Sequence, residues 1–385
     1  MDSHIKNEEE KKEYFDSKEE LELKIEQLAL WIKDSHHFVA FTGAGISTGA
    51  GIADFRSGKN TVLETGPGIW EKKALHLTEK PKVSTDMLKA FPTKCHMSLL
   101  KLIDEGYLKY IISQNIDGLH RKSGIPPEKI SELHGNTNIE TCPKCKKEYL
   151  RDFRTRTAKT VKDHQTGRVC TVKDCGGMLN DSIINFTEAL PEKAMDLAFY
   201  HSAISDLHLV MGSSLRVQPA ASMPDDTVKK GGRLVIINLQ KTPLDDVASM
   251  IIHAKIDDVI DLLMPKLKLT IPTWKITRRV LFQLDNEATL SVKAIDVDGT
   301  PHSTFKQINL NINGKVTENK KEPFVFKDKF SKEFILELIF HGYYDEPGLK
   351  LTLDPKNLNN KIYLLEYDPY TKKWDEVTAL DYYFD

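Results

Sequence analysis

The chain has 385 residues, of which 40% are apolar and 29% charged, and its formal net charge is −2. This length is sufficient for one substantial α/β domain and a second, smaller one, while the small net charge excludes a global attraction to nucleic acid. The sequence lacks the run of roughly 20 apolar residues that spans a bilayer, and its charged N-terminus is unlike a signal peptide. We therefore expect an intracellular protein that does not contact membranes.

The first part of the chain predicts a disordered segment followed by a helix. Residues 1–20 are dominated by Glu, Lys and Asp, a composition that buries too little apolar surface to become ordered. Leu21, Ile25, Leu28 and Ile32 then recur at helical spacing. We expect an amphipathic helix here, packed against the strands that follow.

Four short apolar runs predict buried strands, with helical patterns between them. They lie at 38–40, 108–112, 207–211 and 234–237. Strands that alternate with helices predict an α/β fold with a doubly wound, Rossmann-like parallel sheet. Such sheets bind ligands at the carboxyl ends of their strands, and each run is followed there by polar residues or glycine. These four ends are residues 42–45, 113–115, 212–214 and 238–240.

Closely spaced glycines follow the first predicted strand. Residues 41–51 read Phe-Thr-Gly-Ala-Gly-Ile-Ser-Thr-Gly-Ala-Gly. Glycines at a strand-to-helix junction let backbone N–H groups approach a pyrophosphate. The alternative is an ordinary turn, because Gly43 and Gly45 lack the usual spacing to a third glycine.

Four of the five cysteines form two close pairs, Cys142 with Cys145 and Cys170 with Cys175. Two such pairs suit four thiolates around one Zn²⁺, and a four-sulfur site is structural because it leaves no coordination position open. The alternative is two redox pairs or buried thiols. Cys95 is left over and is expected to be a small core residue.

The stretch between the cysteine pairs is strongly basic. Residues 146–169 hold eight basic and three acidic side chains, a local net charge of +5. Such a segment could contact phosphate, in nucleic acid or chromatin, or an acidic protein surface. The alternative, which such a charged insertion favours, is a solvated loop.

The last third of the chain predicts a separate domain without a catalytic constellation. A closing helix is expected at 257–267, followed by an extended linker at 269–273. Beyond it, apolar and polar residues alternate over several short runs, and Asn313-Gly314 has the sequence of a hairpin turn. We predict a C-terminal antiparallel β-sandwich of about seven strands over 276–385.

Two further motifs contain candidate catalytic residues. Ser-Gln-Asn-Ile-Asp-Gly-Leu-His at 113–120 ends a predicted strand, and Glu-Leu-His-Gly at 132–135 lies just ahead of the cysteines. Together with the glycine-rich turn, Gly-Ser-Ser-Leu at 212–215 and Asn-Leu-Gln at 238–240, this ordered set resembles the sirtuins, NAD-dependent protein lysine deacylases. The resemblance covers about residues 21–272. Within the family it is greatest to the sirtuin-six and sirtuin-seven branch, through residues 66–70, 231–236 and 269–272.

The resemblance implies a Rossmann-like domain with an inserted zinc module at about 136–180, and a cleft that NAD and the acyl-lysine enter from opposite sides. It assigns catalysis to His134, as general base, and Asn115. An imidazole suits this role near neutral pH, although a loop histidine with satisfied hydrogen bonds is the alternative. His120 has no family role and is expected to be structural. The implied metal ligands are Cys142, Cys145, Cys170 and Cys175.

The resemblance also implies a set of cofactor contacts. Arg56 would reach the pyrophosphate and Phe55 would shield the reacting ribose carbon. For Gly212 the alternative is a plain turn, and for Asn238 and Gln240 it is capping of strand ends. The full implied set is Ala44, Thr48, Phe55, Arg56, Trp70, Gln114, Ile116, Asp117, Gly212, Ser214, Asn238, Gln240 and Ile256.

Residues 181–191 resemble the segment that pairs with the substrate peptide as an added strand, and Phe186 is the aromatic residue expected there. Packing between lobes is the alternative for Phe186. Two features depart from the family pattern: Ala53 replaces a usual proline, and residues 59–65 are extra. Both lie in the cofactor-covering loop, and a longer loop is expected to close more slowly. The contact of Trp70 depends on aligning the chain across that insertion.

The sequence thus predicts an NAD-dependent protein lysine deacylase that releases nicotinamide and O-acyl-ADP-ribose. Histones or other nuclear proteins are the expected substrates and the nucleus the expected location, with the cytoplasm as the alternative. One rival function is protein mono-ADP-ribosyl transfer in the same site. Another is a chromatin- or partner-binding scaffold with weak catalysis.

Overall fold

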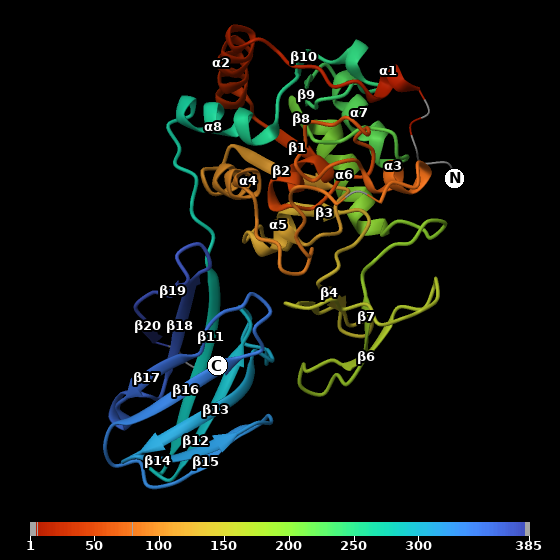
Figure 1. Ribbon diagram of the computed structural model, residues 1–385. Coiled ribbons are helices and arrows are strands. Elements are labelled where there is room, and N and C mark those ends of the chain that lie inside the picture. Colours follow the sequence, from red (N-terminus) through yellow and green to blue (C-terminus); the bar gives the residue numbers. More distant parts are fainter. Residues whose placement is uncertain (1–4, 6, 79, 382–385) are drawn as a thin grey trace. The chain divides into compact units, whose positions relative to one another are not determined.

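The computed structural model describes residues 5, 7–78 and 80–381 (Figure 1). The chain forms two compact units, one built chiefly from residues up to Thr273 and the other chiefly from Trp274–Asp385. No helix among the described residues has the length and apolar character needed to cross a membrane.

The first unit is built on a six-stranded, all-parallel sheet, which confirms the predicted doubly wound fold. Its spatial order is β10 (Met250–Ile252), β9 (Arg233–Ile237), β8 (Leu207–Met211), β1 (Phe38–Thr42), β2 (Leu108–Ser113) and β3 (Ile130–Glu132). The chain runs outward from β1 in one direction and then, from β8, in the other. The strand order therefore reverses between β1 and β8, the place where open α/β sheets bind ligands.

Helices cover both faces of this sheet because strand residues alternate between the faces. Phe38 and Ala40 pack with α2 (Lys18–Asp34), α4 (Lys94–Asp104) and α8 (Ile256–Lys266). Val39 and Phe41 pack on the other face with α6 (Glu192–Ile204) and α7 (Met223–Lys229). The predicted first helix begins earlier than residue 21, since Ser17 and Glu20 form a capping box that fixes its start.

Part of the segment that composition suggested would be disordered is ordered in the structure. Residues Glu8–Lys11 form α1, Tyr14 N–H donates to the Leu239 carbonyl and Asp16 N–H to the His253 carbonyl. These backbone bonds fix the segment along the strand ends of the sheet. Composition misses them because the contacts are made by backbone groups and by paired charges.

Smaller elements lie outside this parallel sheet. The cysteine-bearing module is a four-stranded antiparallel sheet in the order β5 (Glu148–Leu150), β4 (Ile139–Thr141), β7 (Met178–Asp181) and β6 (Gln165–Val169). The remaining helices are α3 (Ile69–Ala74), α5 (Leu119–Lys122) and the 3-10 turns η1 (Ala44–Ala50), η2 (Pro127–Lys129), η3 (Ala220–Ser222) and η4 (Asp245–Val247).

The second unit is an antiparallel sandwich around one apolar core, as predicted, but its described residues form ten strands where about seven were expected. One sheet contains β15 (Phe324–Lys327), β12 (Thr289–Ile295), β11 (Ile276–Asp285), β18 (Lys361–Asp368), β19 (Lys373–Trp374) and β20 (Thr378–Asp381). The other contains β14 (Lys315–Asn319), β13 (Phe305–Ile312), β16 (Phe334–Phe340) and β17 (Leu349–Leu353), and η5 is Pro355–Asn357. Asn313 and Gly314 both have positive φ in the β13–β14 hairpin, as the dipeptide predicts.

Candidate active site and metal centre

A cavity of about 1060 Å³ lies in the first unit where the strand order reverses. Residues that follow β1, β2, β8 and β9 line it, so the four polar strand ends predicted from sequence come together. The predicted site residues that line it are Ala44, Thr48, Phe55, Arg56, Trp70, Gln114, Asn115, Ile116, His134, Phe186, Gly212, Ser214, Asn238, Gln240 and Ile256.

Two glycines, Gly45 in the turn after β1 and Gly212 in the turn after β8, form the floor of the cavity, and neither can carry a side chain. A Cβ on Gly45 would lie 2.6 Å from Gly212 Cα, and one on Gly212 would lie 2.6 Å from Gly45 Cα. Gly212 also has φ +61°, which L side chains rarely adopt. The two turns therefore pack backbone against backbone, which leaves the space above them open to a ligand.

His134 has one ring nitrogen, Nδ1, in a hydrogen bond within the protein, while its Nε2 has no hydrogen-bond partner among the described residues. Its Nδ1 donates to the Gln114 carbonyl at 2.9 Å, because a carbonyl can only accept. The half-buried ring has a pKa lowered by desolvation, against which the Gln114 hydrogen bond acts. The imidazole is thus neutral at pH 7 with Nε2 as the acceptor nitrogen, the state that a general base requires.

Asn115 and Gln114 connect the strand ends around the cavity. Asn115 Nδ2 donates to the Gly43 carbonyl at 3.0 Å, and Gln114 Oε1 accepts from Ser213 Oγ at 2.9 Å. Asn115 is buried, so this amide is oriented by the glycine-rich turn. The two contacts tie the end of β2 to the turns after β1 and β8.

Arg56 is fixed above the floor by three neighbours. Its Nη1 donates to Ser214 Oγ at 3.1 Å, its guanidinium lies 4.3 Å from the Trp70 ring centroid, and Asp54 accepts its backbone N–H. Burial first, and the charge of Arg216 second, lower the pKa of Arg56 to about 10. The group remains a cation at neutral pH, in a site where its charge is poorly screened.

Residues 59–65, the expected insertion, lie between two chain segments that are joined by backbone hydrogen bonds. Gly68 N–H donates to the Ser57 carbonyl, and Trp70 N–H donates to the Phe55 carbonyl. A Cβ on Gly68 would lie 2.3 Å from Arg56 N, so glycine is needed for this close approach. The Trp70 ring is therefore held close to the Phe55 ring, at a tilt of 39° with centroids 4.8 Å apart, and its centroid lies 6.3 Å from that of Phe186.

Asp117 is the one predicted cofactor residue that does not line the cavity. It is buried, and accepts from Ser47 Oγ at 2.7 Å and from Leu119 N–H at 2.9 Å. Asp117 thereby joins the turn after β1 to the start of α5. His120 is buried as expected, and its Nε2 pairs with Thr42 Oγ1 at 2.8 Å.

The cavity also has lining residues that sequence reasoning missed. Glu13 belongs to the segment that was expected to be disordered, and its carboxylate accepts from Thr61 Oγ1 and Val62 N–H of the insertion. Arg216 follows Ser214 by two residues and pairs with Glu10. The sequence contained a signal for Arg216, because a cationic residue so close to a turn predicted to bind phosphate is itself a candidate phosphate contact.

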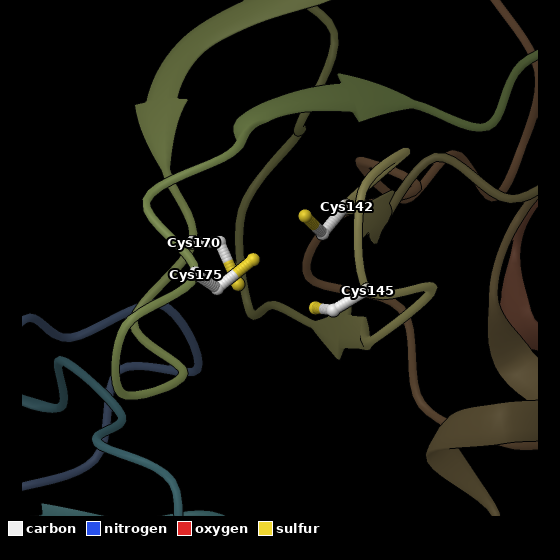
Figure 2. A group of neighbouring side chains, drawn as sticks. All are labelled: Cys142, Cys145, Cys170 and Cys175. Atoms are coloured by element: carbon white, nitrogen blue, oxygen red, sulfur yellow. The ribbon is translucent and has the colours of Figure 1, made fainter.

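The four predicted metal ligands converge on one point, as Figure 2 shows. The sulfur atoms of Cys142, Cys145, Cys170 and Cys175 all lie within 4.8 Å of one another. Four thiolates around Zn²⁺ at the usual bond length would be about 3.8 Å apart, so this set fits one structural zinc ion. Cys95 is buried in the core with α4, as expected, and is not part of the group.

The arginines of the basic stretch are largely used inside the module. Arg151 and Arg168 both donate to the fully buried Glu140, at 2.8 and 2.7 Å, and Arg156 donates to Asp181 at 2.9 Å. Glu140 and Asp181 lie outside residues 146–169, so the local charge of +5 overstates what is available to a partner. The network stabilises the module around its cysteines.

A parallel sheet whose strand order reverses beneath such a cavity defines an α/β enzyme of the dinucleotide-binding class. Residues 43–219 match the model of the Sir2 family. An NAD-dependent protein deacetylase SRT1 from Arabidopsis thaliana is 39% identical over 358 residues, which cover 87% of this chain and 71% of that protein. The NAD-dependent protein deacetylase Sirt6 from Drosophila melanogaster is 39% identical over 271 residues, 68% of this chain and 81% of that protein. The chain belongs to the Sir2 family.

Two further matches complete the comparison. The NAD-dependent protein deacetylase sirtuin-7 from Homo sapiens is 37% identical over 282 residues, 71% of this chain and 67% of that protein. A solved structure described as Sir2 bound to acetylated peptide is 31% identical and aligns with a TM-score of 0.47, covering 64% of this chain and 99% of that chain. The Arabidopsis match, over 87% of the chain, is longer than the first unit and so reaches into the sandwich.

Proposed function

We propose that this protein is an NAD-dependent protein lysine deacylase. The bond between nicotinamide and the ribose of NAD breaks, and the acyl group passes from the lysine nitrogen to a ribose hydroxyl. One water molecule is consumed, so the products are lysine, nicotinamide and O-acyl-ADP-ribose. Catalysis is assigned to residues 21–272, with the zinc module at about 136–180 inserted, and 276–385 form a separate domain. The enzyme class is that of the relatives, which are named NAD-dependent protein deacetylases.

The observation that carries this proposal is the orientation of His134. Its Nδ1 is occupied by the Gln114 carbonyl, which leaves Nε2 to accept a proton inside a cavity floored by the two glycine turns. A neutral imidazole fixed in one tautomer can deprotonate a ribose hydroxyl, whereas a free ring would have to be ordered first.

The other lining residues take roles that their contacts support. Arg56, held between Ser214 and Trp70, would neutralise diphosphate charge. Phe55 would keep water from the reacting carbon, and Asn115 would orient the ligand through an amide that is already positioned. The remaining contacts would come from Ala44, Thr48, Gln114, Ile116, Gly212, Asn238, Gln240 and Ile256, with Asp117 acting through Ser47.

The acylated peptide would enter beside residues 184–188. Ile184 N–H donates to the His134 carbonyl at 3.0 Å, which places this segment directly beside the proposed base. Phe186 lines the cavity yet is 65% exposed, so an incoming peptide could cover it. Backbone pairing with a peptide strand would then leave the lysine side chain directed at the cavity.

The finer proposal is that the acyl-lysine lies on a histone or another nuclear protein, and that the enzyme acts in the nucleus. Its support is the likeness to the proteins named Sirt6 and sirtuin-7. Fractionation of cells that express the full-length chain, followed by mass spectrometry of histone acyl-lysines, tests both parts.

The central experiment is mass spectrometry of an acetylated histone peptide incubated with the full-length protein and NAD. We expect the peptide to lose the acetyl mass only when NAD is present. A peptide that instead gains the mass of an ADP-ribose would show mono-ADP-ribosyl transfer and would overturn our proposal. His134→Tyr should abolish the acetyl loss, and His36→Tyr, at an exposed histidine remote from the cavity lining, should not. Unchanged activity in His134→Tyr would show that the base is misassigned.

A further inference from the structure

Arg216 is a second guanidinium on the same cavity as Arg56. It follows β8 and lies two residues beyond Ser214, the hydroxyl that holds Arg56. Leu215, between them, is buried and has φ 50°, a strained value for a non-glycine residue. Such strain persists where the surrounding structure fixes the residue, and it sets the direction in which Arg216 leaves the turn.

The hydrogen-bonding capacity of Arg216 is only partly used. Its Nη2 pairs with Glu10 Oε2 at 2.8 Å, while its Nε is buried and finds no hydrogen-bond partner among the described residues. A buried donor without a partner is destabilising. The side chain is 28% exposed, so it is neither a free surface group nor a satisfied core group.

Arg56 and Arg216 both line the cavity, and their like charges repel each other unless an anion binds to both. The charge of Arg216 acts directly on Arg56, whose pKa it lowers. A diphosphate carries two negative charges, and guanidinium groups bind phosphate oxygens through two parallel hydrogen bonds. A dianion bound by both side chains would offset their repulsion.

We propose that Arg216 is a second diphosphate-binding residue for NAD. It would act together with Arg56, and its ion pair with Glu10 would hold it in position. The role rests on the proposed function, because it assigns the anion to the dinucleotide. Glu10 is a positioning residue here, because its carboxylate pairs with Nη2 and so restrains the guanidinium.

Calorimetric titration of the full-length protein with ADP-ribose and with nicotinamide tests this role. Arg216→Gln should weaken ADP-ribose binding about tenfold, the loss expected for one charge-assisted contact. Nicotinamide has no phosphate, so its binding should change less than about twofold. Arg216→Lys keeps the charge without the planar fork and should fall between the two. In turnover, the KM for NAD should rise about tenfold while the KM for the acetylated peptide is unchanged.

Two control variants separate this role from general effects. Arg233→Gln removes an exposed cation from the opposite end of β9, where it lies over the Trp31 ring, and should leave ADP-ribose affinity unchanged. Glu10→Gln breaks the same ion pair as Arg216→Gln but retains the guanidinium, so it should weaken ADP-ribose binding by less than about threefold.

Equal losses in Glu10→Gln and Arg216→Gln would overturn the inference, since the effect would then come from the ion pair. Unchanged ADP-ribose affinity in Arg216→Gln, or a matching loss of nicotinamide binding, would also overturn it. If the wild-type protein bound neither NAD nor ADP-ribose, the proposed function itself would fail. Thermal unfolding of each variant checks that the fold is retained.

Discussion

Lys11 and Glu71 form a buried ion pair, with Nζ and Oε1 3.0 Å apart and side chains only 6% and 3% exposed. The pair joins the N-terminal segment to α3, the helix that carries Trp70 into the cavity wall. The Lys11 carbonyl also accepts from Gln240 Nε2 at 3.1 Å. Lys11 thus links α3 to the turn that follows β9.

Breaking this pair on one side should destabilise the loop. Lys11→Ala leaves Glu71 charged and buried, which costs about 3–5 kcal/mol in comparable sites. Amide hydrogen exchange should rise over residues 54–75, and the Tm should fall. Lys94→Ala is the matched control, because the Lys94–Asp261 pair is 56% and 49% exposed and should contribute no more than about 1 kcal/mol. Equal effects of the two variants would contradict the role we give Lys11.

The pH dependence of turnover should report His134. Desolvation lowers the pKa of its imidazole, so the ring stays neutral to a pH below the ordinary histidine value of about 6.5. We expect kcat/KM to fall as the pH decreases, with an acid limb centred below that value. His36→Tyr should leave the profile unchanged. An acid limb centred above 7 would mean that another group controls the reaction.

The metal should be lost when any of the cysteine ligands is removed. Cys142→Ser and Cys175→Ser should reduce the zinc content, measured by mass spectrometry of the metal, from one ion per chain toward none. The Tm should fall because a closed site of this kind contributes folding energy. Cys95→Ser, at the buried cysteine in the first turn of α4, should keep the full metal content.

Acid should destabilise the first unit through its buried histidines. His208 is buried with Nδ1 paired to Thr227 Oγ1, and desolvation lowers its pKa to about 3. Between pH 3 and 6.5 the unfolded chain binds this proton and the folded chain does not, so stability is lost as the pH falls through that window. From pH 6.5 to 5 the loss for one such group is about 2 kcal/mol. Urea unfolding should show a weaker pH dependence in His208→Leu.

Periodicity predicted the strands that are long and buried on both faces. Phe38–Thr42 and Leu207–Met211 are continuous apolar runs because helices cover both faces of the sheet. The edge strands β3 and β10 have only three residues each, too few for a period to be recognised. The sandwich also contains short strands, such as the two-residue β19, and has ten strands in place of the predicted seven or so.

The candidate site was predictable where a motif fixes local backbone geometry. Gly45, Gly212 and His134 belong to motifs whose spacing implies a strand end or a turn, and all three line the cavity. The contribution of Glu13 and Lys11 was not predictable, because it comes from contacts with residues that are distant in sequence. Asp117 shows the converse, since a motif residue can act one layer behind the cavity.

The mutual packing of Gly45 and Gly212 has a consequence for protein engineering. Neither position can accept even a methyl group while the other backbone stays where it is. A cavity altered to admit a bulkier dinucleotide analogue must therefore be widened on another wall, such as the one formed by residues 54–57 and Trp70. The floor offers no room for redesign.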